Sequence, residues 1–574
     1  MKRTNLKPLK IRPFDVHLRV HAYDLAAIGI IAMGVFIRFF LVFQGWPHTN
    51  IDEGTMGEMA MNIAFRGEHP VFFYGQDYMG ALQAYLAAGL FRLFGVSLFT
   101  LRLGLVFLFA LFLISMYLMA SLLYTKKLAL FSIFLLSLGA NSVLYREVQA
   151  IGGYAETLLF GSVALLLASW LALSSHTSDQ EIPSVTQRWR LVAYGGWGFA
   201  VGLGLWSDLL IIPSAVMSGL LLLLFCRRDM YTWAPVFLVL GLTLGALPLI
   251  LFNLNARPGH DTLSMVLAIY SEGQHTPLRQ LLPRSTTSAF LIGLPTATNY
   301  ISVCNISETL FFGGSGPGAL QCALTQGAWS LGIIALWISV AILAIRTVWT
   351  FWYRTSAKVR SFELQQDMKR SCARLAVLFA VGISFVLFAI SAAAIYAPGL
   401  NARYLICVLI GTPALLYPLW KSASALKETR QRMVKIIGSS KRLILLFVTL
   451  VLLLGTVETL LDIPNAQASN QQQYDLVHNL LRIGAKHIYS EYWSCDRIDF
   501  QSQEQITCSV VNDQLQPSGD RYHANGVIVQ SDPQSSYVFP LNSLQAKSSA
   551  QHFAHTSKHY QRFVFDGYIV YQPI

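Results

Sequence analysis

Two adjacent carboxylates, Asp52 and Glu53, directly follow the first long apolar run of the chain. A carboxylate at a membrane boundary is costly to bury, so one that is held in a cavity there is a candidate for chemistry. Its simplest use is as a general base, which takes a proton from an attacking hydroxyl. The alternative for Asp52 is structural, because an acidic residue at this position caps a helix N-terminus and stabilises its dipole. The two roles are compatible.

Three arginines have side chains suited to binding a phosphate group. Arg102, Arg146 and Arg403 stand at the ends of apolar runs. A guanidinium offers paired donors that match phosphate oxygens. The alternative for each is snorkelling, in which the long side chain reaches from the bilayer edge into water. Snorkelling is the reading we favour for Arg38, which falls inside the first apolar run.

The elements that must position these residues are membrane spans. Of the 574 residues, 54% are hydrophobic and only 13% are charged, and the mean hydropathy is +0.49. An average soluble domain has about 25% charged residues. Apolar runs near the ~20 residues that cross a bilayer recur along the chain, and we predict about eleven spans. They fall at 24–45, 98–123, 128–143, 155–174, 191–206, 209–225, 232–252, 329–350, 374–395, 404–420 and 443–461.

The basic residues predict the orientation. More than half of the 42 Lys and Arg residues lie in the segment 1–23 and in alternate short loops, which fits the excess of positive charge on the cytoplasmic side. We therefore expect a cytoplasmic basic arm at 1–23, a signal anchor rather than a cleaved signal peptide, and a plasma-membrane location. The net charge of +12 is explained in this way, so no nucleic-acid partner is expected.

The chain divides into a transmembrane domain at 24–461 and a C-terminal domain at 462–574. The first outer loop, 46–97, contains a helix at 53–66 whose apolar positions recur at helical spacing, with Glu58, Asn62 and Arg66 on the opposite side. We expect this helix in the membrane interface, and we prefer a surface or re-entrant helix at 80–94, although its length leaves a span open.

A long outer loop, 253–328, contains Cys304 and Cys322, and the C-terminal domain contains Cys495 and Cys508. Both pairs lie on the oxidising side in this topology, so two disulfides are expected. Short β-like runs at 506–511, 526–530, 537–540 and 564–571 predict a small extracytoplasmic α/β domain.

The local sequence resembles the GT-C superfamily of membrane glycosyltransferases, in the branch of protein mannosyltransferases and aminoarabinose transferases. The resemblance is carried by Asn50-Ile51-Asp52-Glu53-Gly54, Tyr74-Gly75-Gln76-Asp77-Tyr78-Met79-Gly80, Leu101-Arg102-Leu103-Gly104, Gly152-Gly153-Tyr154-Ala155-Glu156 and Asn401-Ala402-Arg403-Tyr404-Leu405. It covers the first 200 residues best. An Asp-Glu pair alone is a weak motif, and its position and companions strengthen it.

The resemblance implies inverting sugar transfer on the outer membrane face, from a polyprenyl-phosphate-linked donor to a protein, lipid or glycan acceptor. Asp52 takes the place of the general base, with Glu53 beside it. Glu156 is the best match for a second carboxylate, and Glu147 is the alternative. The outer arginines and Tyr404 would then serve the lipid phosphate.

One departure concerns the first outer loop. The aminoarabinose transferases carry a Lys in the segment that matches Gln76-Asp77-Tyr78, whereas this chain has Asp77. The departure argues against the aminoarabinose activity itself and leaves phosphate binding to arginine. Asp77 would instead bind the acceptor or a metal. Because no Asp-x-Asp motif stands in this loop, a divalent metal is possible but has no motif to support it.

Aromatic residues are interleaved with these candidates. Tyr74 and Tyr78 have two readings, sugar stacking and anchoring at the membrane interface. Two other functions compete with sugar transfer for the whole chain. A transporter would show paired repeats and polar sites at mid-membrane, whereas the candidates here gather at one face. A scaffold for envelope assembly would use the C-terminal domain as its binding module.

Overall fold

The structure is a computed structural model that describes residues 22–175, 184–272, 278–301, 303–353, 362–424, 432–554 and 559–574. Residues 1–21 of the predicted basic arm, which spans 1–23, therefore lie outside the described residues. Contacts within the chain define two units. Unit 1 comprises Met1–Val35, Leu108–Val143 and Tyr154–Val457, and unit 2 comprises Phe36–Phe107, Leu144–Gly153 and Glu458–Ile574.

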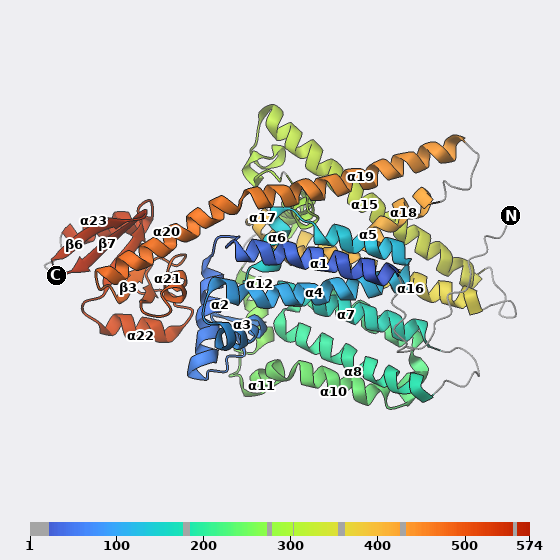
Figure 1. Cartoon of the computed structure of the whole chain (residues 1–574), viewed down its shortest axis with the longest axis horizontal. Coiled ribbons are helices and arrows are strands. Elements are labelled where there is room, and N and C mark those ends of the chain that lie inside the picture. The colour runs from blue at the N-terminus through green and yellow to red at the C-terminus, as the bar shows by residue number, and fades with distance from the viewer. Residues whose placement is uncertain are drawn as a thin grey trace. The chain divides into compact units, whose positions relative to one another are not determined.

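Seven helical segments in the described part of the chain are long and apolar enough to cross a membrane (Figure 1). They are α1 (Ala22–Phe43), α4 (Leu98–Leu123), α7 (Tyr154–Leu173), α15 (Gly316–Tyr353), α16 (Phe362–Ala389), the run of α17 (Pro398–Asn401), η9 (Ala402–Gly411) and α18 (Thr412–Ser424), and the run of α19 (Arg432–Leu461) and α20 (Ile463–Arg482). The chain is thus a multi-pass membrane protein, as its apolar runs predict.

Two bent helix pairs raise the number to nine if each pair counts as one span. Helices α5 (Lys126–Ser137) and α6 (Asn141–Val148) meet at 87°, and α10 (Ala234–Gly245) and α11 (Leu247–Asn255) meet at 67°. Leu138 ends α5 with an extended backbone. Pro248 lies in the first turn of α11, where its missing N–H costs no helical hydrogen bond.

The two other predicted spans, 191–206 and 209–225, form helices that do not meet the same test of length and hydropathy. They lie in α8 (Ser184–Ser207) and in η2 (Leu209–Ile211) with α9 (Ile212–Phe225). The remaining helices of unit 1 are η3 (Arg227–Tyr231), α12 (Thr262–Glu272), α13 (Leu278–Ser288), η4 (Ala289–Gly293), α14 (Leu294–Ala297), η5 (Ile306–Glu308), η6 (Leu310–Phe312) and η8 (Ala392–Ala394). In the long outer loop, Cys304 and Cys322 form a disulfide.

The first outer loop belongs to unit 2 and folds into α2 (Ile51–Met61), η1 (Asn62–Arg66), β1 (Phe72–Phe73), β2 (Gln76–Gly80) and α3 (Leu82–Phe94). Strands β1 and β2 pair antiparallel. Helix α3 has 13 residues. At 1.5 Å per residue it is roughly 20 Å long, which is shorter than a hydrocarbon core of about 30 Å. On its own it cannot cross the bilayer, which agrees with the preferred surface or re-entrant helix.

Helix α2 forms where the periodicity predicts it, but most of its polar stripe does not face outward. Glu58 is 1% exposed and Asn62 is fully buried. The cause is α21 (Cys495–Gln501), a helix of the C-terminal region that packs against α2 within unit 2. Of the three polar residues, Arg66 stays exposed while Glu58 and Asn62 are covered by protein, which the sequence pattern alone cannot show.

Two glycines allow α2 to approach α21 closely. A Cβ atom on Gly54 would lie 2.6 Å from the carbonyl oxygen of Asp496, and one on Gly57 would lie 2.3 Å from the ring of Phe500. Real Cβ atoms do not come so near to other heavy atoms, so any larger residue at these positions must push the helices apart. The spacing of three residues places both glycines on the same face of α2.

The C-terminal region of unit 2 contains a five-stranded sheet with the order β4-β3-β5-β7-β6. Its strands are β3 (His487–Ser490), β4 (Thr507–Val510), β5 (Ser536–Pro540), β6 (Tyr560–Phe565) and β7 (Tyr568–Pro573). Strand β3 runs parallel to β4 and β5, whereas β7 runs antiparallel to β5 and β6. Helices α22 (His523–Ser531) and α23 (Leu544–Ala554) complete this α/β domain, which the strand-like runs predict.

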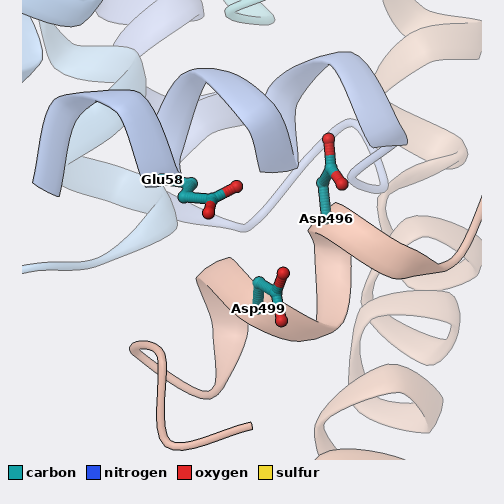
Figure 2. Close-up of side chains that lie close together, drawn as sticks. All are labelled: Glu58, Asp496 and Asp499. Atoms are coloured by element: carbon teal, nitrogen blue, oxygen red, sulfur yellow. The ribbon is translucent and has the colours of Figure 1, made fainter. Parts of the chain in front are cut away.

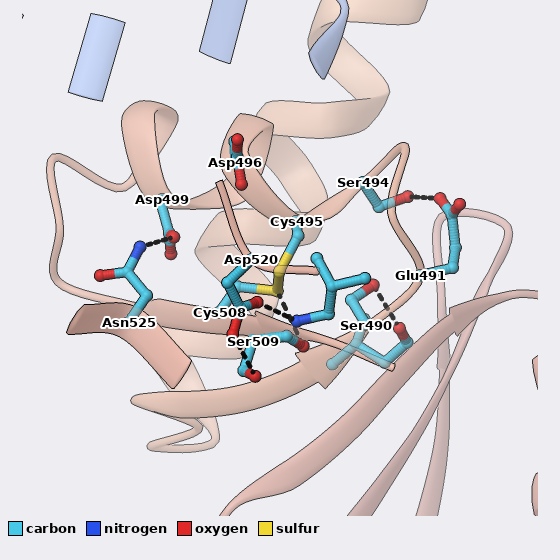
Figure 3. Close-up of a disulfide and its surroundings, with 12 residues drawn as sticks. Ser490, Glu491, Ser494, Cys495, Asp496, Asp499, Cys508, Ser509, Asp520 and Asn525 are labelled. Atoms are coloured by element: carbon cyan, nitrogen blue, oxygen red, sulfur yellow. Dashed lines mark hydrogen bonds between the residues drawn. A yellow bond between two sulfur atoms is a disulfide. The ribbon is translucent and has the colours of Figure 1, made fainter. Parts of the chain in front are cut away.

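Two of the predicted strands have a different structure. Residues 526–530 lie in α22, where Gly526 and Val529 are buried while Val527 and Ile528 are exposed, as the spacing of a helix requires. The run 564–571 is a hairpin rather than one strand, because Asp566 and Gly567 turn the chain with positive φ angles of 49° and 83°. The disulfide between Cys495 and Cys508 joins the start of α21 to β4 (Figure 3).

Gly54→Ala should destabilise the protein. The added methyl group meets the backbone of Asp496 and Arg497, which cannot rotate away, so the cost should be about 1–3 kcal/mol. We expect a lower melting temperature of the purified protein. Gly89→Ala is the matched control, because nothing lies within 4 Å of its new Cβ. It should leave the melting temperature unchanged or raise it. Equal melting temperatures for the two variants would contradict the close packing of α2 on α21.

Candidate functional site

Asp52 lies in the first turn of α2, one residue inside its start. The cap is Asn50, whose backbone is extended and whose side-chain oxygen accepts a hydrogen bond from the backbone N–H of Glu53 at 3.0 Å. The capping role considered for Asp52 therefore falls to Asn50. Asp52 keeps the favourable interaction with the positive end of the helix dipole, and its side chain is 19% exposed.

Arg521, just before α22, holds the carboxylate of Asp52. Its Nη2 donates to Oδ1 of Asp52 at 2.6 Å, and its Nε donates to the hydroxyl of Tyr492 at 2.8 Å. The guanidinium carbon also lies 5.1 Å from the ring centre of Phe73 and 5.3 Å from that of Tyr492, within range of a cation–π contact. Oδ2 of Asp52 has no hydrogen-bond partner among the described residues. One oxygen of Asp52 is thus fixed, and the other is available.

A cleft of about 610 Å³ lies in the C-terminal domain beside this pair. Tyr492 connects the two, since it lines the cleft and contacts Arg521. The cleft is also lined by Trp493, which is 65% exposed, and by Asn512 and Asp513. An exposed aromatic face with amide and carboxylate groups around it suits a polar ligand.

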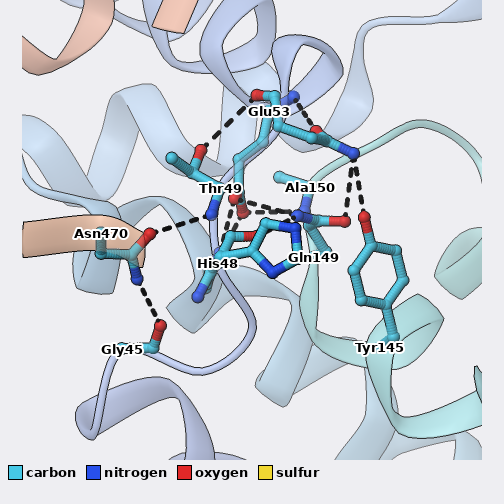
Figure 4. Close-up of polar contacts among 10 residues, drawn as sticks. Gly45, His48, Thr49, Glu53, Tyr145, Gln149, Ala150 and Asn470 are labelled. Atoms are coloured by element: carbon cyan, nitrogen blue, oxygen red, sulfur yellow. Dashed lines mark hydrogen bonds and ion pairs between the residues drawn. The ribbon is translucent and has the colours of Figure 1, made fainter. Parts of the chain in front are cut away.

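Glu53 has the opposite environment from Asp52, because its side chain is fully buried. Arg102 donates to both of its oxygens, Nε to Oε1 at 2.7 Å and Nη2 to Oε2 at 2.6 Å. The backbone N–H of Ala150 and the side chain of Gln149 also reach Glu53, at 3.3 and 3.4 Å (Figure 4). Arg102 is itself fully buried. The pair therefore ties α2 to α4 and to the segment after α6.

Arg38 and Glu147 form a second buried ion pair in unit 2. Nε and Nη2 of Arg38 donate to Oε2 of Glu147 at 3.1 and 2.6 Å, and the two side chains are 0% and 2% exposed. Snorkelling of Arg38 is thus excluded, because its guanidinium is enclosed with a carboxylate. Arg146 neighbours Glu147 in α6 and is 6% exposed.

Tyr74 takes part in a cluster of hydrogen bonds in the first outer loop. Its hydroxyl donates to Glu68 at 2.5 Å, and the hydroxyl of Tyr522 donates to the other oxygen of Glu68 at 2.6 Å. The two tyrosine rings stack with their centres 4.9 Å apart. Burial and the neighbouring carboxylate raise the pKa of Tyr74. The other candidates of this loop lie on β2 and are partly exposed: Gln76, Asp77 and Tyr78.

Three candidates belong to unit 1. Glu156 is fully buried in the first turn of α7. The guanidinium carbon of Arg403 lies 5.7 Å from the ring centre of Tyr154 and 5.4 Å from that of Tyr404. Burial raises the pKa of Asp208 to about 6, and the positive charge of Arg403 opposes this shift. The structure therefore brings Tyr154 to the neighbouring pair Arg403 and Tyr404 within this unit.

Sequence analysis missed a buried carboxylate cluster in unit 2, formed by Glu58 of α2 with Asp496 and Asp499 of α21 (Figure 2). Burial and mutual repulsion raise the pKa values of Glu58 and Asp499 well above their usual range. Burial also raises the pKa of Asp496, to about 6. The only local signal was two aspartates three residues apart. Arg521 and Tyr492 were missed for the same reason, since they meet α2 only in the folded chain.

No family model and no curated protein sequence matches the chain. Solved structures match it. The oligosaccharyltransferase of Archaeoglobus fulgidus, in complex with zinc and sulfate, aligns over 95% of this chain and 72% of its own, with 13% identity and a TM-score of 0.50. ArnT from Cupriavidus metallidurans bound to undecaprenyl phosphate aligns over 96% and 98%, with 12% identity and a TM-score of 0.48. The chain thus has the GT-C fold that the sequence predicts.

Removing one partner of the buried Glu53–Arg102 pair should destabilise the protein strongly. Glu53→Leu and Arg102→Met each leave a buried group that has lost its partner, which typically costs about 3–5 kcal/mol. The double variant Glu53→Leu, Arg102→Met removes both charges, so it should melt at a higher temperature than either single variant. Asp24→Asn, which breaks the exposed pair with Lys126, is the control and should change stability by less than about 1 kcal/mol. Additive losses in the double variant would contradict the coupling.

Proposed function

We propose that the chain is an inverting glycosyltransferase that moves a sugar from a polyprenyl-phosphate-linked donor to an acceptor hydroxyl. The observation that carries the proposal is the carboxylate of Asp52, which is partly exposed, oriented by Arg521 and located at the start of a helix in a GT-C fold. Of the two adjacent carboxylates, only Asp52 keeps an oxygen that no described residue occupies.

In this mechanism, Oδ2 of Asp52 accepts the proton of the acceptor hydroxyl as its oxygen attacks the anomeric carbon. The bond between that carbon and the phosphate oxygen breaks, and polyprenyl phosphate leaves with the bonding electrons. Attack from the face opposite the leaving group inverts the anomeric configuration, and no covalent enzyme intermediate forms. The acceptor hydroxyl belongs to a protein, a lipid or a glycan.

Glu53 and Arg102 act as positioning residues rather than reacting groups in this proposal. Both are fully buried and occupied by each other, so Arg102 has no exposed face to offer a phosphate. Their role is to fix the position of α2, and with it the position of Asp52 in the first turn of that helix. Glu147 has the same type of role, because Arg38 occupies it.

The phosphate of the donor is assigned to Arg403 with Tyr404, and Arg146 is the further candidate. Arg403 is only partly buried, and its guanidinium is bordered by the rings of Tyr154 and Tyr404. A guanidinium suits this role because its planar N–H groups match phosphate oxygens and its positive charge stabilises the charge that grows on a leaving phosphate. Glu156 stays a candidate for a second carboxylate role in unit 1.

The reaction is placed on the outer face of the plasma membrane, with the N-terminus in the cytoplasm. The excess of basic residues in alternate loops supports this orientation. The two disulfides support it too, because Cys304–Cys322 and Cys495–Cys508 fall in segments that it puts in an oxidising compartment.

Asp52→Asn should abolish sugar transfer and keep the fold. The substituted amide oxygen still accepts the hydrogen bond from Arg521 but cannot take a proton, so the rate should fall by about 10²–10⁴-fold. The assay measures polyprenyl phosphate released from synthetic polyprenyl-phosphate sugars, with the melting temperature as the check on folding. Asp367→Asn removes a carboxylate that is 63% exposed in unit 1 and should retain full activity. Full transfer by Asp52→Asn would exclude Asp52 as the base.

Labelling tests the orientation. Asp475 lies on an exposed part of α20, so a single cysteine placed there by Asp475→Cys should react with a membrane-impermeant maleimide in intact cells. A cysteine at Lys126, at the start of α5, should react only after the membrane is permeabilised, because the two positions are expected on opposite sides. The reverse pattern of labelling would overturn the proposed orientation.

A further inference from the structure

Three carboxylates converge inside unit 2 away from Asp52. Glu58 projects from α2 toward Asp496 and Asp499, which lie one turn apart on α21 (Figure 2). One oxygen from each residue can be chosen so that all lie within 4.8 Å of one another. The side chains are 1%, 5% and 2% exposed, so water does not screen their charges. Such an arrangement is unfavourable unless positive charge or protons compensate it.

No basic side chain in the described parts of the chain forms an ion pair with this cluster. The two arginines whose charges act on the cluster are engaged elsewhere, since Arg66 pairs with Glu504 and Arg521 pairs with Asp52. The protein supplies only neutral donors. Asn525 donates one amide nitrogen to Glu58 Oε1 at 2.7 Å and to Asp499 Oδ2 at 2.9 Å, and the hydroxyl of Thr55 donates to Asp496.

Two oxygens of the cluster are enclosed and accept no hydrogen bond of normal geometry from the described residues. They are Oε2 of Glu58 and Oδ1 of Asp499. Each belongs to a side chain that is at least nine-tenths buried, and each carboxylate already uses its other oxygen for Asn525. Buried carboxylate oxygens without donors are rare in folded proteins, and each calls for a ligand. Oxygen atoms without donors are also the ligands that hard divalent cations prefer.

We propose that Glu58, Asp496 and Asp499 bind one divalent cation, of the size and hardness of Ca²⁺. Opposite oxygen ligands of Ca²⁺ lie roughly 4.6–5.2 Å apart, since each Ca–O distance is about 2.3–2.6 Å, whereas Mg²⁺ spans only about 4.2 Å. One oxygen of each residue lies within 4.8 Å of the others, a spread that the shell of the larger ion covers. Ca²⁺ usually takes six to eight ligands, so water would complete the shell.

The cation would join α2 to the C-terminal domain. It would neutralise the negative charge where the two helices are closest, beside Gly54 and Gly57, and it would hold the same helix that carries Asp52. This site is separate from Asp52, and the inference does not depend on the proposed sugar transfer. Its readouts are cation binding and stability.

The test uses the full-length protein, purified in detergent and stripped of metal with EGTA. Equilibrium dialysis against ⁴⁵Ca²⁺ should give one bound ion per chain, and added CaCl₂ should raise the melting temperature. Asp499→Asn and Glu58→Gln should each weaken binding by at least tenfold and remove the rise in melting temperature. Glu504→Gln is the matched control, because it removes a neighbouring carboxylate that pairs with Arg66 and lies outside the cluster, and its binding should match that of the unaltered chain.

Two outcomes would overturn the proposal. Absence of saturable Ca²⁺ binding by the unaltered stripped protein would mean that protons, not a cation, neutralise the cluster. Equal Ca²⁺ binding by Asp499→Asn and the unaltered chain would place any bound ion elsewhere. If Asp499→Asn does not fold, Glu58→Gln decides between the outcomes, because the substituted amide oxygen still accepts the hydrogen bond from Asn525.

Discussion

The contact between α2 and α21 is the constraint on which the rest of unit 2 depends. Helix α2 carries Asp52 in its first turn. The buried positions of α2 must pack against α21, a helix of the C-terminal region. Gly54 and Gly57 make that fit possible because they present no side chain to α21. Close approach then brings Glu58 against Asp496, and it sets α2 beside the segment that carries Arg521.

Asp52 and Glu53 show how environment separates the roles of two neighbouring carboxylates. Successive residues of a helix point about 100° apart, so the two side chains face different surroundings. Glu53 faces the protein interior. Arg102 donates one hydrogen bond to each of its carboxylate oxygens, so neither oxygen is free. Asp52 faces the loop before α22, where one arginine contacts one of its oxygens. Burial makes the first residue an anchor, and the second stays partly exposed with one oxygen that no described residue occupies.

Sequence patterns predicted the features that depend on local chemistry. The apolar runs, the helix after Asn50 and the α/β character of the C-terminal domain all follow from periodicity or composition, which neighbouring residues determine. The patterns failed where a partner comes from a distance. Arg38 was assigned to snorkelling because nothing in its own helix shows that Glu147, 109 positions away, will meet it. The strand expected at 526–530 was a helix, because a short β-branched run does not distinguish the two states.

The same limit explains why the carboxylate cluster was not foreseen and why the C-terminal domain matters. Glu58 and Asn525 are 467 positions apart, and each reads as an ordinary polar residue in its own segment. In the folded unit they share a hydrogen bond, and Arg521, which orients Asp52, lies four residues before Asn525. A domain that only covered the membrane region would not need to supply the side chains nearest to the proposed base. Because this one does, the environment of Asp52 is built by residues of both the loop 46–97 and the C-terminal domain.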